Sequence, residues 1–287
     1  TRMLGTRRSR SVTAATPANS RVTGTGFLYV LGGATDAAGT PSSAVYRGTL
    51  AADGTVSAWT AVTSLPAPLH SPGAAIFHGD LYLVGGATTG NAPVATVYRS
   101  RLDAAGGLGP WQPQPSLPFR RAHFGFGAFG GYLHTCGGDS GAVAPNSGGQ
   151  SATSIADVAF AKINLRTGDL EVSGWATAGN KLTKSVSKHT AVVAGGYVLI
   201  TAGLYNGATS GSTEESYTQL NPDGTVSSFN GATGSNTIES LASGGNLFNH
   251  AAVGYTDAAG VFHVLVAGGD DVNTPGQKPP RVDFALR

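Results

Sequence analysis

The stretch "DLYLVGG", residues 80–86, decides the fold because close copies of it recur along the chain. The other copies are "FLYVLGG", "YLHTCGG", "YVLITAG" and "FHVLVAGG". The five copies end at Gly33, Gly86, Gly138, Gly203 and Gly269, at spacings of 53, 52, 65 and 66 residues. Recurrence at such a period indicates a repeat architecture, in which each copy marks one structural unit.

Each copy belongs to a unit of four short runs that have the pattern of strands. An apolar stretch precedes the copy, and an alternating run such as "ATVYRSRL" follows it. Asp-Gly at 53–54 and at 223–224 is a strong hairpin signal after two of those runs. Four short strands per unit predict an all-β fold, namely a β-propeller of four-stranded antiparallel blades. The runs after four of the copies lead to an aromatic residue: Trp59, Trp111, Trp175 or Phe229.

We expect a single propeller domain over residues 1–287, with five visible repeats. The units span approximately 5–65, 66–117, 118–181, 182–241 and 242–287. The fifth unit stops at "RVDFALR" without a fourth strand, while "RMLGTRRSRS" aligns with "VTSLPAPLHS" and places Leu4 opposite Leu65. The N-terminal segment is therefore expected to close the last blade. A fragment of a larger ring is the alternative.

The units resemble the kelch repeat. They share the di-glycine that closes the second strand, the aromatic residue before it and the Trp on the fourth strand. They also share "SLPAPLH" or "SLPFRRAH", which leads into the next unit. The resemblance covers nearly the whole chain and departs from the pattern at Ala202, which replaces a glycine, and at Phe229, which replaces Trp. It implies a propeller, and kelch propellers commonly have six or seven blades.

The string "GDSG", residues 138–141, also surrounds the nucleophile of chymotrypsin-type proteases. In register with the other repeats it begins the loop between strands two and three, where other units carry Ala-Thr or Asp-Asp. Such a protease also needs a histidine base, a buried carboxylate and an oxyanion hole. No histidine segment here resembles that family's motif, so we interpret the glycines as turn residues and Ser140 as non-catalytic.

Histidines and acidic residues raise the question of a metal site. Because each of four histidines opens the first strand of its unit, a shared structural role at that position is favoured over metal binding. We therefore expect no metal and no other cofactor. Asp270 and Asp271, followed by Asn273, offer oxygen ligands for calcium, but their spacing lacks the full pattern of a known calcium loop. The four histidines are His70, His123, His189 and His250.

The alternation of strands predicts where a ligand would bind. In a four-stranded blade, the loops between strands two and three and the connections to the next blade emerge on one face. These are the long, variable segments here, such as "DSGAVAPNSGGQSATS", and variable loops on a rigid scaffold commonly carry binding. The residues expected on this ligand-binding rim are Arg120, Arg121, Asp139, Tyr205, Asn206, Asp270 and Asp271.

Composition narrows the classes of function. Only 12% of residues are charged and the net charge is +2, which gives no reason to expect nucleic acid or an acidic membrane surface as a partner. No stretch reaches about 18 uninterrupted apolar residues, so no membrane span is expected. With a single cysteine, Cys136, the chain has no internal disulfide. No signal peptide is visible in the chain, which begins at Thr1.

Three classes of function compete. The uncharged loops, rich in Gly, Ser and Thr, favour a non-enzymatic extracellular or cell-surface module that binds a protein or glycan, or that builds a larger assembly. The first alternative is a carbohydrate-active enzyme, since kelch-like propellers occur among sugar oxidases and epimerases. A copper oxidase of that kind needs a tyrosine–cysteine pair, and Cys136 lies inside a predicted strand. The second alternative is an intracellular adaptor with further domains.

Overall fold

The computed structural model describes residues 11–15, 26–36, 38–51, 55–56, 58–144, 153–194, 196–205, 212–231, 247–256, 262–267, 270–271 and 282–286. Within these ranges the chain is all-β apart from one 3₁₀ turn, Thr89–Asn91. A search of the same ranges for a helix with the length and apolar character to cross a membrane finds none.

Consecutive strands pair antiparallel into sheets, which we call blades 1 to 5. Blade 1 consists of β1 (Ser11–Ala15), β2 (Gly26–Leu31), β3 (Val45–Leu50) and β4 (Thr60–Val62). Blade 2 consists of β5 (Gly73–Phe77), β6 (Asp80–Val84), β7 (Val97–Arg101) and β8 (Gln112–Gln114). Blade 3 consists of β9 (Gly125–Phe129), β10 (Tyr132–Cys136), β11 (Val158–Ile163) and β12 (Leu170–Thr177).

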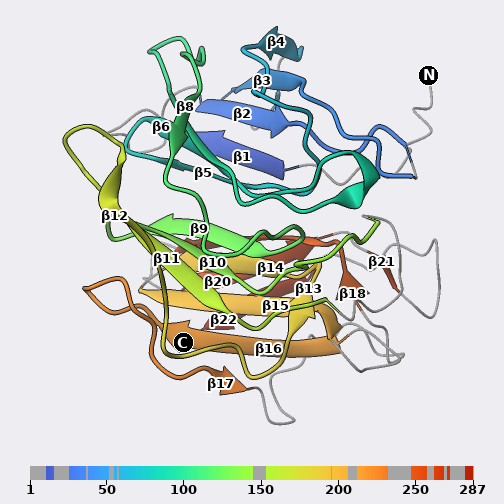
Figure 1. The fold of residues 1–287 in the computed structure, drawn as a ribbon, viewed down its shortest axis with the longest axis vertical. Coiled ribbons are helices and arrows are strands. Elements are labelled where there is room, and N and C mark those ends of the chain that lie inside the picture. The colour runs from blue at the N-terminus through green and yellow to red at the C-terminus, as the bar shows by residue number, and fades with distance from the viewer. Residues whose placement is uncertain are drawn as a thin grey trace. The chain divides into compact units, whose positions relative to one another are not determined.

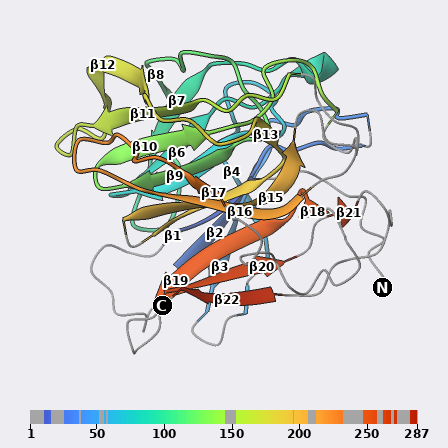
Figure 2. The same cartoon turned by 90° about the horizontal axis from the view of Figure 1, so that it is seen from below.

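Blade 4 contains β14 (Thr190–Ala194), β15 (Tyr197–Tyr205), β16 (Ser212–Gln219) and β17 (Asn230–Gly231), with β13 (Val186–Ser187) also paired to β15. Blade 5 contains β19 (Ala251–Thr256), β20 (Phe262–Ala267) and β22 (Val282–Leu286), and nearby β18 (Leu247–Phe248) pairs with β21 (Asp270–Asp271). Figure 1 labels most of these strands, and Figure 2 labels β19 and shows it side by side with β20 and β22.

The predicted fold class is confirmed: the chain is all-β and its four-stranded antiparallel sheets have the blade-like arrangement of a β-propeller. The quoted stretch "DLYLVGG" forms β6 and the turn after it. All five residues of β6 are buried, because this strand lies between β5 and β7 and is covered on both faces. The segment predicted to close the last blade falls on residues 1–10, outside the described residues.

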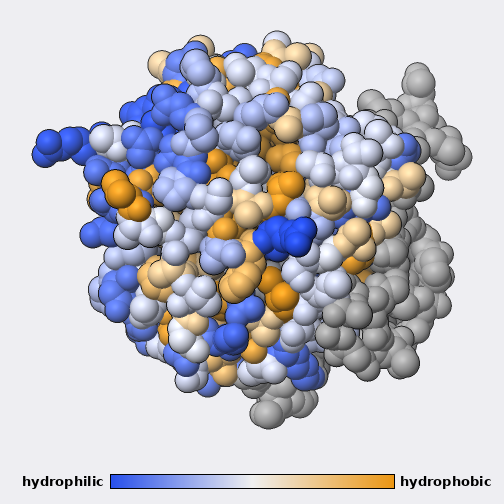
Figure 3. Space-filling model, in the orientation of Figure 1, coloured by the Kyte–Doolittle hydropathy of each residue, from blue (hydrophilic) through white to orange (hydrophobic). Residues whose placement is uncertain are grey.

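The chain divides into two compact units. Unit 1 comprises Thr1–Ala122, Ala142–Asn146 and Ile163–Gly174, and unit 2 comprises His123–Gly141, Ser147–Lys162 and Trp175–Arg287. Each unit has its own apolar core, with Tyr29 and Leu81 in unit 1 and Val158 and Ile200 in unit 2. The single domain over residues 1–287 stays a prediction. On the face shown in Figure 3, hydrophobic residues are interspersed with hydrophilic ones.

In blades 1 to 3, the second glycine of the di-glycine joins its blade to the connection that leads into the next one. The N–H of Gly86 donates to the carbonyl of Arg121 at 2.9 Å, and the N–H of Gly138 donates to the carbonyl of Val186 at 2.8 Å. A Cβ on Gly86, whose φ is +93°, would lie 2.9 Å from the carbonyl oxygen of His70. Glycine is therefore required both for the backbone angle and for the close approach.

A second backbone feature, a left-handed residue before the first strand, was not predicted from the sequence. The residue two positions before the first strand of blades 2 to 5 has a left-handed conformation although it is never glycine. In unit 2 these residues are hydrogen-bonded in series: Lys188 N–H donates to the His123 carbonyl at 2.8 Å, and Asn249 N–H donates to the Lys188 carbonyl at 2.9 Å. Blades 3, 4 and 5 are thus joined by backbone bonds. The four residues and their φ angles are Ser71 (51°), His123 (55°), Lys188 (54°) and Asn249 (54°).

Candidate functional site

The residues predicted for the ligand-binding rim differ in exposure. Arg120 is exposed, whereas the exposed fraction is 0% for Arg121, 0% for Asp139 and 7% for Tyr205. The expectation that these last three present their side chains at the surface is wrong. Whether the rim binds a ligand stays a prediction.

The other three rim residues are described less fully. Asn206 lies outside the described residues. Asp270 and Asp271 form β21, and their backbones pair with Phe248 and Leu247. Their side chains are outside what the structure describes. The prediction of calcium at this pair therefore stays a minor alternative.

Arg121 is buried because the repeat places its position in the core. Its carbonyl accepts the hydrogen bond from Gly86, as Leu69 accepts one from Gly33 and Val186 accepts one from Gly138. Leu69 and Val186 are buried apolar residues at this position. The position is therefore internal whether its residue is apolar or charged, and a sequence pattern that treats arginine as a surface residue misplaces it.

The carboxylate of Asp139 is the centre of a buried polar cluster in unit 2. Its Oδ2 lies 3.1 Å from Nδ1 of His123, and its Oδ1 accepts a hydrogen bond of 3.1 Å from Oγ of Ser154. Oγ of Ser154 is also 3.3 Å from Oγ of Ser187. Burial lowers the pKa of His123; the hydrogen bond and charge of Asp139 oppose this effect, and the charge of Lys188 adds to it. His123 is therefore neutral at pH 7.

This cluster fixes the loop between β10 and β11. In a nucleophilic triad the imidazole accepts the proton of the hydroxyl. Here the hydroxyl of Ser154 donates to the carboxylate of Asp139 instead, which orients the serine without activating it. Ser140 of the "GDSG" string donates to the carbonyl of Thr153 at 2.9 Å, in keeping with a turn residue.

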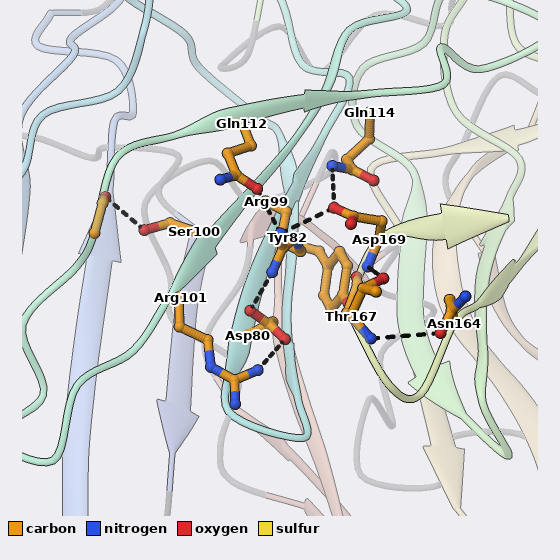
Figure 4. A network of polar contacts seen from close by, with 12 residues as sticks. Asp80, Tyr82, Arg99, Ser100, Arg101, Gln112, Gln114, Asn164, Thr167 and Asp169 are labelled. Carbon is orange, nitrogen blue, oxygen red and sulfur yellow. Dashed lines mark hydrogen bonds and ion pairs between the residues drawn. The ribbon is translucent and has the colours of Figure 1, made fainter. Parts of the chain in front are cut away.

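A second polar network lies in unit 1, on strands β6, β7 and β8 and the turn before β12 (Figure 4). The carboxylate of Asp80 is buried and accepts hydrogen bonds from Nη1 of Arg99 at 2.9 Å and from Nη1 of Arg101 at 2.7 Å. Nη2 of Arg99 also lies 2.9 Å from Asp169 and donates to Gln112. Arg99 thus connects blade 2 to the turn between the third and fourth strands of blade 3.

Asp169 is a partly exposed member of this network. Burial raises its pKa, but hydrogen bonds from Gln114 and Thr167 and the charge and hydrogen bond of Arg99 outweigh that effect and leave the pKa below its ordinary value. The carboxylate is therefore charged at neutral pH and balances the guanidinium of Arg99.

The same network contains a hydrogen bond that recurs between blades. The hydroxyl of Tyr82 donates to the carbonyl of Gly168 at 2.6 Å, and the hydroxyl of Tyr29 donates to the carbonyl of Gly106 at 2.7 Å. Burial raises the pKa of both phenols, to about 12 for Tyr29, so both hydroxyls stay protonated donors at any ordinary pH. Each acceptor is a left-handed glycine in the turn between the third and fourth strands of the following blade.

In blade 3 a histidine makes the corresponding bond. His134 stands where Tyr29 and Tyr82 stand, three residues before the di-glycine, and its Nε2 lies 3.0 Å from the carbonyl of Gly224. Because a carbonyl only accepts, Nε2 carries the proton. Burial lowers the pKa of His134, although the bond to Gly224 opposes this. The sequence contained a signal for these bonds, namely a side chain that can donate a hydrogen bond three residues before a di-glycine.

The four histidines at the unit starts occupy three different positions, so the prediction of one shared position is wrong. Counted back from the first residue of the first strand, His70 is third, His123 is second, and His189 and His250 are first. The left-handed residue always lies two positions before the first strand, whereas the position of the histidine differs between blades. No three His, Cys, Asp or Glu side chains form a metal-binding group in the part of the chain that the structure describes.

These hydrogen bonds and ion pairs have a structural role: they join neighbouring strands and blades. The Asp139 cluster fixes a loop in unit 2, and the Asp80 network ties blade 2 to a turn of blade 3 within unit 1. No protein-family model matches the chain, and no curated protein matches it.

Proposed function

We propose that the chain is a kelch-like propeller without enzymatic activity, which serves as an extracellular or cell-surface module. It binds a protein or glycan on the face formed by the loops between second and third strands and by the connections between blades, or it contributes that face to a larger assembly. The observation that carries the proposal is the connection into blade 3, where Phe119 is 48% exposed and Arg120 is also exposed.

The backbone of this connection is fixed while its side chains vary. Leu117 N–H donates to the carbonyl of Ala95 at 2.9 Å, and Arg121 N–H donates to the carbonyl of Val94 at 3.1 Å. The connection into blade 2 has the short side chains of Ala67 and Pro68 where this one has Phe119 and Arg120. A rigid backbone therefore holds an aromatic ring and a guanidinium at the surface, the two groups that contribute most often to binding at interfaces.

A scaffold role also explains the burial of the ionisable side chains. Asp139, His123 and Asp80 are buried in contacts that fix loops and join blades. Catalysis in these clusters would need a group aimed at a substrate, whereas the bonds described above are directed at neighbouring strands. This supports a binding or structural module over the carbohydrate-active alternative.

The test is to measure binding of the full chain to a panel of glycans and cell-wall polysaccharides, with calcium and with chelator. We expect saturable binding that Arg120→Ala weakens by about tenfold, the typical loss for one interface arginine, with an unchanged urea midpoint. Arg166→Ala is the matched control, because Arg166 is also exposed but lies in the turn between β11 and β12, at the other end of the strands. Equal losses in the two variants, or consumption of a sugar substrate, would contradict the proposal.

A further inference from the structure

Buried imidazoles join the blades of unit 2. Among the described residues, unit 2 buries four histidines, whereas unit 1 buries His70 alone. His189 opens blade 4, and its Nε2 accepts a hydrogen bond of 3.0 Å from the backbone N–H of Gly125 in β9 of blade 3. The four histidines of unit 2 are His123, His134, His189 and His250.

The bond to Gly125 requires a neutral imidazole. A backbone N–H can only donate, so Nε2 of His189 must carry a lone pair, and the ring proton must be on Nδ1. When the ring takes up a second proton, Nε2 becomes a donor that faces another donor, and the bond is lost. Glycine at this position lets the imidazole approach the strand, because a Cβ on Gly125 would lie 2.9 Å from this nitrogen.

His250 makes the corresponding connection from blade 5 to blade 4. Its Nε2 lies 2.7 Å from Oγ1 of Thr201 in β15, and its carbonyl accepts a hydrogen bond of 2.9 Å from Oγ1 of Thr190 in β14. Burial, and then the charge of His189, lower the pKa of His250 to about 3. The two imidazoles are therefore close enough that a positive charge on one opposes a positive charge on the other.

Other titratable groups lie near the pair within the part of the chain that the structure describes. The thiol of Cys136 lies beside Gly125 and donates to its carbonyl at 3.6 Å, so it faces the His189 contact from β10. Lys188 and Asp139 act on the neighbouring His123. Lys188 also places its ammonium 5.9 Å from the ring centroid of Phe248.

We propose that the His189–His250 pair is an acid-sensitive latch that joins blades 3, 4 and 5 and opens unit 2 before unit 1 as the pH falls. At neutral pH both rings are uncharged and hold their blades together. When protons bind, His189 loses the bond to Gly125, and two positive charges that repel each other are buried in unit 2. Two side-chain hydrogen bonds that join blades within unit 1 come from Tyr29 and Tyr82, whose hydroxyls do not gain a proton in this range.

The direction in which stability changes with pH follows from proton linkage. A histidine whose pKa is lower in the folded than in the unfolded chain stabilises the fold fully above its unfolded value of about 6.5. That stability is lost as the pH falls from the unfolded pKa toward the pKa of the histidine in the folded chain. Each such ring lowers the folding equilibrium constant up to about tenfold per pH unit, and two rings lower it up to about 100-fold.

The three tryptophans allow each unit to be followed separately. Trp59 and Trp111 lie in unit 1 and Trp175 lies in unit 2. Urea unfolding is measured between about pH 7.5 and 5.5, above the ordinary carboxylate range, in two backgrounds: Trp175→Phe reports unit 1, and Trp59→Phe with Trp111→Phe reports unit 2. We expect the equilibrium constant of unit 2 to fall by about tenfold or more per pH unit below 6.5, and to fall more steeply than that of unit 1, which buries one histidine against four in unit 2.

Two variants assign the effect to the latch. His189→Gln keeps an acceptor oxygen and removes the titration of His189, so it should make the pH dependence of unit 2 less steep. His78→Gln is the control, because His78 is exposed on the β5–β6 turn and should change nothing. Equal pH dependence in the two units, or an unchanged slope in folded His189→Gln, would overturn the proposal.

A measurement on the unaltered chain decides the case even if His189→Gln does not fold. Nitrogen-15 NMR of the histidine rings should find the Nδ1–H tautomer at His189 and the Nε2–H tautomer at His134 near pH 7. Both rings should resist protonation until unit 2 opens. An Nε2–H tautomer at His189, or its titration near 6.5 with unit 2 intact, would exclude the latch.

Discussion

Replacing Gly203 with alanine is expected to lower the free energy of unfolding by about 3–5 kcal/mol, as the sum of backbone strain and overpacking. The φ of Gly203 is +107°, a conformation that disfavours any residue with a Cβ. An added Cβ would lie 2.7 Å from Cβ of His189 and 2.8 Å from the carbonyl oxygen of Ser187. Neither neighbour is a flexible side-chain end, so the backbone of the connection into blade 4 must shift.

Gly196 provides a matched control in the same blade. Its φ of +83° is also left-handed, but an added Cβ would meet nothing within 4 Å. Gly196→Ala therefore tests strain alone and should cost about 1–2 kcal/mol. Urea unfolding of the two variants measures both values. Equal losses would show that the close approach of Gly203 to the connection contributes nothing.

Asp80→Ala is expected to lower the free energy of unfolding by about 3 kcal/mol, because it leaves a buried guanidinium without its main carboxylate. Asp80 is 1% exposed and contacts both Arg99 and Arg101. Asp169 remains as a partner of Arg99 at 2.9 Å, which limits the loss.

Asp80→Phe should be much less destabilising than Asp80→Ala. In blade 1 the corresponding position is Phe27, and the guanidinium of Arg47 lies 5.3 Å from its ring centroid. Arg47 and Arg99 occupy equivalent positions in the third strands of blades 1 and 2, since each lies opposite the tyrosine of the second strand. Urea unfolding should therefore find a loss for Asp80→Phe of less than about half that of Asp80→Ala. A larger loss than in the alanine variant would show that the two junctions are not equivalent.

The repeat made the strands predictable. Each copy of "LYLVGG" type has a mostly apolar run closed by glycine, and the strands β2, β6 and β10 fall on those runs because central strands are covered on both faces. Composition and strand alternation sufficed for the all-β class and for the four-stranded sheets. The two units were not predictable, since the spacing of the copies is similar across their boundary.

The polar sites were less predictable because their positions depend on three-dimensional contacts. Arg121 and Asp139 are charged residues at positions that hold Leu69 and Ala87 in blade 2, and the sequence alone indicates exposure for both. The left-handed residues before the first strands carry no common side chain. The side chains that bond the turn glycines of the next blade could have been predicted, since Tyr29, Tyr82 and His134 each stand three residues before a di-glycine.

The joining of blades by backbone bonds is tested most directly by amide hydrogen exchange. The donors are the N–H groups of Gly86, Gly138, Lys188 and Asn249. We predict that they exchange at least about 1,000-fold more slowly than the N–H groups of the hairpin-turn residues Gly130 and Gly196, because the donors are released only when blades separate. Exchange at the rate of the turn residues would show that the blades are not held together by these bonds.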